Sequence, residues 1–99
     1  MNARDVESKL LGRCAAVARD AAQSAQDQCE ANVFRLAAMV VQSRLPHESK
    51  NLMQASERYF AAHPEQKLPP AEVVRSGWVI SLPRLRDMLS RQLNWPPSR

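Results

Sequence analysis

The sequence predicts an all-α protein, a small bundle of four or five helices, and three observations support that class. Alanine occurs 14 times and glycine only twice in 99 residues, which favours helix because alanine has the highest helix propensity. Outside the pairs at 40–41, 73–74 and 79–80, β-branched residues are sparse. Most apolar residues recur at steps of three and four, the spacing of one helix face. We expect one domain, 1–99, with one modest core.

The first 45 residues read as helix, because Ala3 to Leu45 contains no proline and a single glycine. Unbroken, such a helix would be about 63 Å long, roughly twice the diameter of a domain of this size. We expect it to break between Ser24 and Asn32, where capping residues gather. The alternative is a long N-terminal helix paired with a second copy, a homodimer. Its narrow seam would consist of Val6, Leu10, Cys14, Val17, Ala21 and Ala25.

The segment from Val33 to Val41 is the best candidate for the core. It is apolar at eight of nine positions, so it is hydrophobic on all sides and belongs in the middle of a bundle. We expect both Phe34 and Met39 to be enclosed by other helices. Arg35 should extend its charged end to solvent along its aliphatic stem.

Proline then divides the rest of the chain. Leu45-Pro46 predicts a helix end and a new start, and the next helix should run to Ala62, where His63-Pro64 stops it. Its buried stripe would be Leu52, Met53, Ser56, Tyr59 and Phe60. Residues 64–70 contain three prolines and should form an extended joint.

The C-terminal part should hold two more helices. Pro69-Pro70 predicts a short helix that Gly77 ends. Residues 78–81 fit either an extended piece or helix. From Leu82 a clear helix follows, with Leu82, Leu85, Met88, Leu89 and Leu93 on one face. The tail 94–99 should leave this helix and either pack Trp95 back or fray.

No catalytic, metal or cofactor motif is present. His47-Glu48 lacks the second histidine of a zinc-protease helix, because that position is Asn51. Cys14 and Cys29 are fifteen residues apart and form no C-x-x-C motif, so we expect them to be apolar packing residues. The two glycines cannot build a phosphate loop. We expect a protein that is not an enzyme and has no cofactor or metal.

Location follows from what the sequence lacks. The charged N-terminus leads into no apolar targeting segment, and no long apolar run exists. We therefore expect a cytoplasmic protein without membrane contact.

The excess positive charge lies mainly in the C-terminal third, where it could meet phosphate, an acidic protein or no particular partner. Of the net charge of +4, most lies in residues 68–99, which hold five basic and two acidic residues. Aromatic, methionine and arginine side chains there are of the kinds that anchor interfaces. The favoured hypothesis is a non-catalytic protein-binding module, an adaptor, chaperone or inhibitor. Its contact residues would be Trp78, Arg84, Met88, Arg91 and Trp95.

The alternative is a small DNA-binding regulator. The order helix, glycine turn, helix in the C-terminal third is that of a helix-turn-helix, although the link from Gly77 to Pro83 is longer than usual. Its nucleic-acid contacts would be Arg75, Arg84, Arg86 and Arg91. Arginines beside an apolar stripe are also common on any surface helix, so nucleic acid is the second choice.

Overall fold

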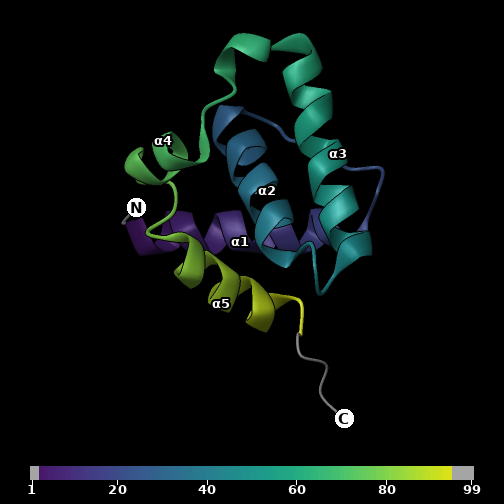
Figure 1. Ribbon diagram of the computed structural model, residues 1–99, viewed down its shortest axis with the longest axis vertical. Helices are drawn as coiled ribbons and strands as arrows, with labels where there is room; N and C mark the ends of the chain where they lie inside the picture. Colours follow the sequence, from purple (N-terminus) through teal and green to yellow (C-terminus); the bar gives the residue numbers. More distant parts are fainter. Residues whose placement is uncertain (1–2, 95–99) are drawn as a thin grey trace.

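All regular structure in the computed structural model, which describes residues 3–94 with side chains from Asp5, is helical (Figure 1). The all-α prediction is therefore confirmed. The tail at 95–99, including Trp95, lies outside the described residues. None of the helices described is both long and apolar enough to cross a membrane. The elements in chain order are α1 (Ala3–Arg19), α2 (Gln28–Val41), α3 (Pro46–Ala62), the 3-10 turn η1 (Pro64–Gln66), α4 (Pro70–Arg75) and α5 (Leu82–Gln92).

The N-terminal helix is broken, as predicted, and the long continuous helix is wrong. The break spans residues 20–27, so it begins before Ser24, and Asn32 lies inside α2. Asp27 caps α2, accepting a hydrogen bond from the backbone N–H of Glu30 at 2.9 Å, and the Glu30 carboxylate accepts from the N–H of Gln26 at 3.1 Å. This reciprocal arrangement resembles a capping box and fixes the start of α2. The preceding loop is held from α3, where Arg58 donates to the carbonyls of Ala21 and Gln23.

The helices α2 and α3 form an antiparallel hairpin joined by buried hydroxyl groups. The Ser49 hydroxyl donates to the carbonyl of Ala38 at 2.6 Å, and the Ser56 hydroxyl donates to that of Ala31 at 2.7 Å. The two contacts lie seven residues apart on each helix, so they recur on one face. Small side chains at these positions let the two backbones approach closely. In Figure 1 this hairpin stands across α1.

Most apolar side chains of the central helix α2 are enclosed, but Met39 is not. Phe34 is fully buried, as expected, but Met39 is 48% exposed. The prediction that both are enclosed is thus wrong for Met39. The helix is covered by α3, α1, α4 and α5, and Met39 projects where none of these elements covers it.

A buried amide ties α2 to the proline-rich joint. Asn32, fully buried, donates to the carbonyl of Gln66 and accepts from the N–H of Leu68, at 3.0 and 2.9 Å. Arg35 donates to the carbonyl of Leu68 as well, and its Nε is buried without a partner. The prediction that Arg35 extends into solvent is therefore wrong, because its guanidinium group secures the joint. The joint itself begins with the turn η1 and is extended only after it.

The predicted seam of α1 packs mostly against other helices of the same chain. Leu10, Cys14 and Val17 are buried, whereas Val6 is 43% exposed and Ala21 lies beyond the helix end. The helices that α1 contacts are α3, α5 and α2 of the same chain. The argument for a homodimer built on this seam therefore no longer holds, because the chain covers the seam itself.

The short helix α4 and the terminal helix α5 close the core from different sides. Val73 of α4 is buried against α2, while Leu85 and Leu89 of α5 are buried against α1 and α2. Gly77 adopts a φ of 84°, which ends α4 in the left-handed conformation that glycine favours. Residues 78–81 contain no regular element, which decides between the two alternatives for this segment.

We predict that Ser56→Ala lowers the free energy of unfolding by about 1 kcal/mol, because one buried hydrogen bond between α2 and α3 is lost. Ser49→Ala should cost a similar amount. The measurement is urea unfolding followed by circular dichroism. Ser8→Ala, at an exposed position of α1, is the matched control and should change stability by less than about 0.5 kcal/mol. Equal effects at Ser8 and Ser56 would contradict the role given to the buried hydroxyl.

Candidate functional site

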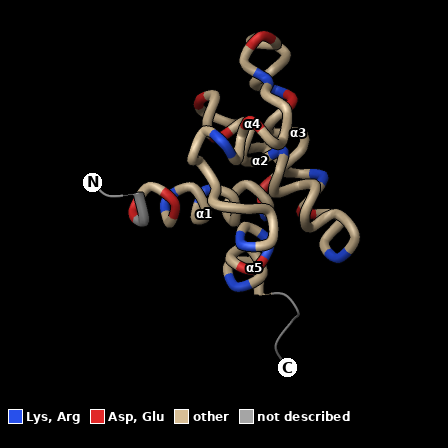
Figure 2. Tube along the Cα trace, turned by 60° about the vertical axis from the view of Figure 1, so that its left-hand side comes forward, with Lys and Arg blue, Asp and Glu red and all other residues tan. Residues whose placement is uncertain are grey.

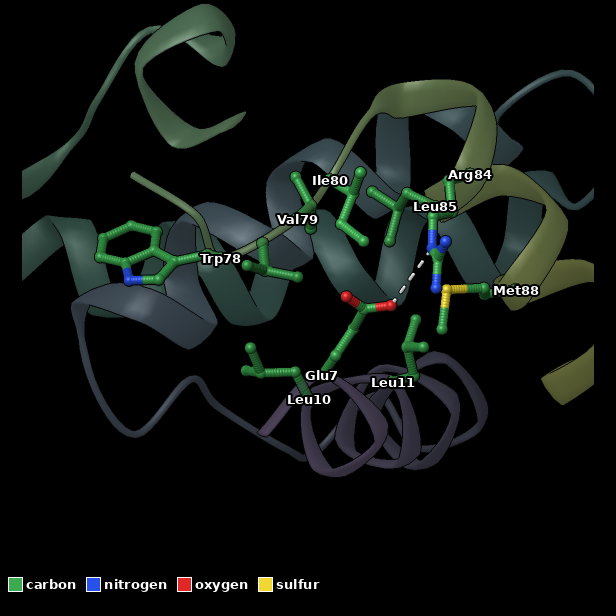
Figure 3. A pocket seen from close by; sticks show the side chains of 10 residues that line it. Glu7, Leu10, Leu11, Trp78, Val79, Ile80, Arg84, Leu85 and Met88 are labelled. Atoms are coloured by element: carbon green, nitrogen blue, oxygen red, sulfur yellow. Dashed lines mark ion pairs between the residues drawn. The ribbon is translucent and has the colours of Figure 1, made fainter. Parts of the chain in front are cut away.

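A shallow apolar depression lies where α1, the segment 78–80 and α5 meet (Figure 3). In the figure Leu11 rises from α1 toward Met88 of α5, whereas Leu10 lies on the side of Trp78 and Val79. Its lining combines residues from three parts of the chain that are distant in sequence: Glu7, Leu10, Leu11, Val33, Trp78, Val79, Ile80, Arg84, Leu85 and Met88.

Local sequence fixes the start of α5 and so places its side chains. Ser81 is the N-cap, with an extended backbone and a hydroxyl that accepts from the N–H of Arg84 at 3.2 Å. Pro83 occupies the first turn, where a missing N–H costs nothing. The chain can therefore turn sharply from the extended segment 78–80 into the helix.

Polar contacts at both ends hold α5 alongside α1. Near its start, Arg84 Nε lies 3.5 Å from Glu7 Oε1. Near its end, Arg19 Nη2 donates to the backbone carbonyl of Gln92 at 2.7 Å, where a cation also suits the helix dipole. The contact near the start of α5 is made with the start of α1, and the contact near the end of α5 with the end of α1. The two helices therefore run in parallel. The depression is the gap between them near their N-terminal ends.

The depression has no room for a small molecule. It encloses about 10 Å³, which is about one water molecule. Val79 and Leu85 form its buried floor, and Trp78 and Met88 are half-buried at its sides. Ile80 is 59% exposed, the highest value among the large apolar side chains described. Among the apolar residues of the lining, Ile80 alone is exposed.

Four of the five residues predicted to bind a partner are described, and the structure brings three of them to this depression. Trp78, Arg84 and Met88 line it. Arg91 is exposed and follows Arg84 and Met88 at the spacing i, i+4, i+7, which is one side of a helix. We call Arg84, Met88 and Arg91 the α5 stripe. The fifth residue, Trp95, lies outside the described residues.

The four arginines proposed for nucleic-acid contact are not brought together. Arg75 pairs with Glu72 on α4, and Arg84 is the partner of Glu7. Arg86 lies on the other flank of α5, in a hollow with Val40, Leu82 and Pro83. Figure 2 shows basic and acidic positions interleaved along the fold, with both signs on α5.

The two C-terminal helices also differ from a helix-turn-helix in the length of their link, in helix length and in packing. Their link spans residues 76–81, longer than the usual turn of three or four residues. The first of them, α4, has only six residues. It packs on α2, whereas α5 packs on α1 and α2.

Sequence reasoning missed Glu7 and Ile80. Glu7 reads as an ordinary charge on an amphipathic helix, and only the parallel packing of α1 and α5 places it beside Arg84. Ile80 stands in the segment that periodicity left undecided. No local pattern distinguishes the two residues, because packing between distant segments decides that Val79 is buried and Ile80 is exposed.

The cysteines and histidines do not assemble a reactive centre among the residues described. Burial raises the pKa of the Cys29 thiol to about 11, with Asp27 and Glu30 adding to the effect, and raises that of Cys14 beyond its usual range. His63 packs on the ring of Tyr59, with the ring centroids 4.6 Å apart, and His47 is exposed. Within residues 3–94, no group of three or more His, Cys, Asp or Glu side chains could hold a metal ion.

Comparison of the chain with protein-family models, curated proteins and solved structures finds no match.

Two arginines of α1 and α5 allow a matched test of which ion pairs stabilise the fold. Arg13 binds the buried Glu30 carboxylate through Nε and Nη2, at 3.1 and 3.2 Å. Arg13→Ala should lower the free energy of unfolding by about 2 kcal/mol, because it leaves a buried charge without its partner. Arg84→Ala should cost less than about 1 kcal/mol, since the Arg84 side chain is 52% exposed. Chemical denaturation of both variants measures the difference, and an equal loss would contradict this ranking.

We also predict that both thiols react slowly in the folded protein. The thiolate is the nucleophile, and the raised pKa of each cysteine keeps it protonated at pH 8. With Ellman's reagent, half-buried Cys29 should react slowly and fully buried Cys14 only on unfolding. Addition of denaturant should make both react at the rate of free cysteine. Rapid labelling of Cys14 in native buffer would contradict the packing of α1.

Proposed function

We propose that the chain is a non-catalytic protein-binding module whose contact surface is the depression together with the α5 stripe. The observation that carries the proposal is Ile80, which projects into solvent at 59% exposure beside half-buried Trp78 and Met88. An exposed β-branched side chain next to a tryptophan and a methionine is the composition of an interface core. As an adaptor, chaperone or inhibitor, the protein would act by occupying a surface of its partner.

The fold supports contact at the depression because it holds its apolar side chains in place before a partner binds. Ser81 and Pro83 fix the start of α5, and Arg19 and Glu7 hold α5 against α1. The apolar groups are therefore presented without an ordering cost on binding, which favours affinity. The arginines at the rim can add charged hydrogen bonds to the partner.

The alternative function, duplex DNA binding, has less support in this geometry. Phosphate binding draws on several cations on one face, whereas Arg75 pairs with Glu72 on α4 and Arg86 lies on the other flank of α5 from Arg84 and Arg91. Retention on heparin that falls steeply with salt, together with measurable duplex affinity, would favour DNA over a protein partner.

The test is affinity capture of a stoichiometric partner with the full chain and with Ile80→Asp. A charge at the centre of an apolar contact should weaken binding at least about tenfold. Ile80 is exposed, so the variant should fold, and circular dichroism checks this. Met39→Asp, at an exposed apolar position on α2 outside the depression, is the control and should retain the partner. Loss with both variants, or with neither, would reject this surface.

A further inference from the structure

We infer that the partner presents an acidic segment to the α5 stripe, with an apolar side chain between two carboxylates. This inference rests on the proposed function and adds the chemistry of the partner. Arg84 and Arg91 stand on either side of Met88 along one edge of α5. Their separation along the helix is about 10 Å, seven residues at the helical rise. Two carboxylates on a partner helix, also seven residues apart, would match that distance.

The apolar part of the contact lies at the centre of the stripe. Met88 is half-buried and lines the depression with Ile80 and Trp78. Its flexible, polarizable side chain adapts to partners of different shape. An apolar partner residue placed over Met88 would thus extend the apolar patch. It would also exclude water from Arg84 and Arg91, which strengthens their ion pairs with the partner's carboxylates.

Charge gives the second part of the argument. On α5 three arginines accompany a single acidic residue, Asp87, and Arg19 adds a cation at the end of the helix. Arg84 Nε lies 3.5 Å from Glu7, and the Arg84 side chain is 52% exposed, so part of its guanidinium group is open to a partner. An acidic segment complements this surface and a basic one is repelled by it.

Nucleic acid would complement the charge of the arginines but would not cover the apolar residues between them. A phosphate backbone offers no apolar group to cover Ile80 and Met88. Base stacking on Trp78 would require an open ring, and this side chain is half-buried. The observations therefore favour a protein segment, and duplex or heparin binding becomes an outcome of the test.

The experiment is selection of phage-displayed random peptides, about 16 residues long, on the full chain. The selected peptides should carry Asp or Glu on both sides of a Leu, Ile, Met or Phe. Synthetic peptides of the consensus should bind Arg84→Ala and Arg91→Ala roughly tenfold more weakly, and more weakly still as salt rises. Arg86→Ala is the matched control on the other flank of α5 and should bind like the wild type. Asp87→Asn should bind a few-fold more tightly, because a repelling carboxylate is removed.

The outcomes separate the inference from the proposed function. Peptides that depend on Ile80 and Met88 but carry no acidic residues would overturn the acidic partner and leave the docking surface standing. Acidic peptides that lose as much affinity in Arg86→Ala as in Arg84→Ala would also overturn it. Failure to select any peptide sensitive to Ile80→Asp, or duplex DNA binding with a steep salt dependence, would reject the docking surface itself.

Discussion

The close antiparallel contact between α2 and α3 is the constraint on which the rest of the structure depends. Ser49 and Ser56 place hydroxyl groups against the carbonyls of Ala38 and Ala31, so the two backbones pack at short range. A longer side chain at either serine would separate the helices and open the core around Phe34. Because that hairpin is fixed, the remaining faces of α2 are left for α1, α4 and α5 to cover.

Polar groups then fix each layer to the hairpin. Asn51 of α3 donates to the carbonyl of Ala18 at 2.8 Å, which holds the end of α1. On the opposite side of α2, Asn32 binds both the carbonyl of Gln66 and the N–H of Leu68. Buried amides of this kind must be satisfied, and their partners exist in one arrangement only. They therefore select a single docking of the outer segments where apolar packing alone would allow several.

The candidate surface is a by-product of this layering. With only α1 and part of α2 beneath it, α5 can bury Leu85 and Leu89 but leaves Met88 half-covered. The short segment before it, which begins at the left-handed Gly77, buries Val79 and leaves Ile80 exposed. Ile80 and half-buried Met88 thus lie at one place, beside Arg84, whereas exposed Val6 and Met39 lie outside the depression. This coincidence is the physical basis for proposing contact with a partner there.

The sequence by itself determined the helical class and several helix limits, but not the end of α1 at Arg19 or the turn η1. Helix α3 was predicted from Pro46 to Ala62, and the buried face of α5 from the spacing of its leucines, because local propensity and periodicity decide such features. Only the tertiary structure decided that Met39 is exposed, that Arg35 holds the joint and that Glu7 meets Arg84. Each of these depends on which neighbour covers a helix face, and that is set by packing between segments far apart in the chain, a relation that periodicity within one segment does not encode.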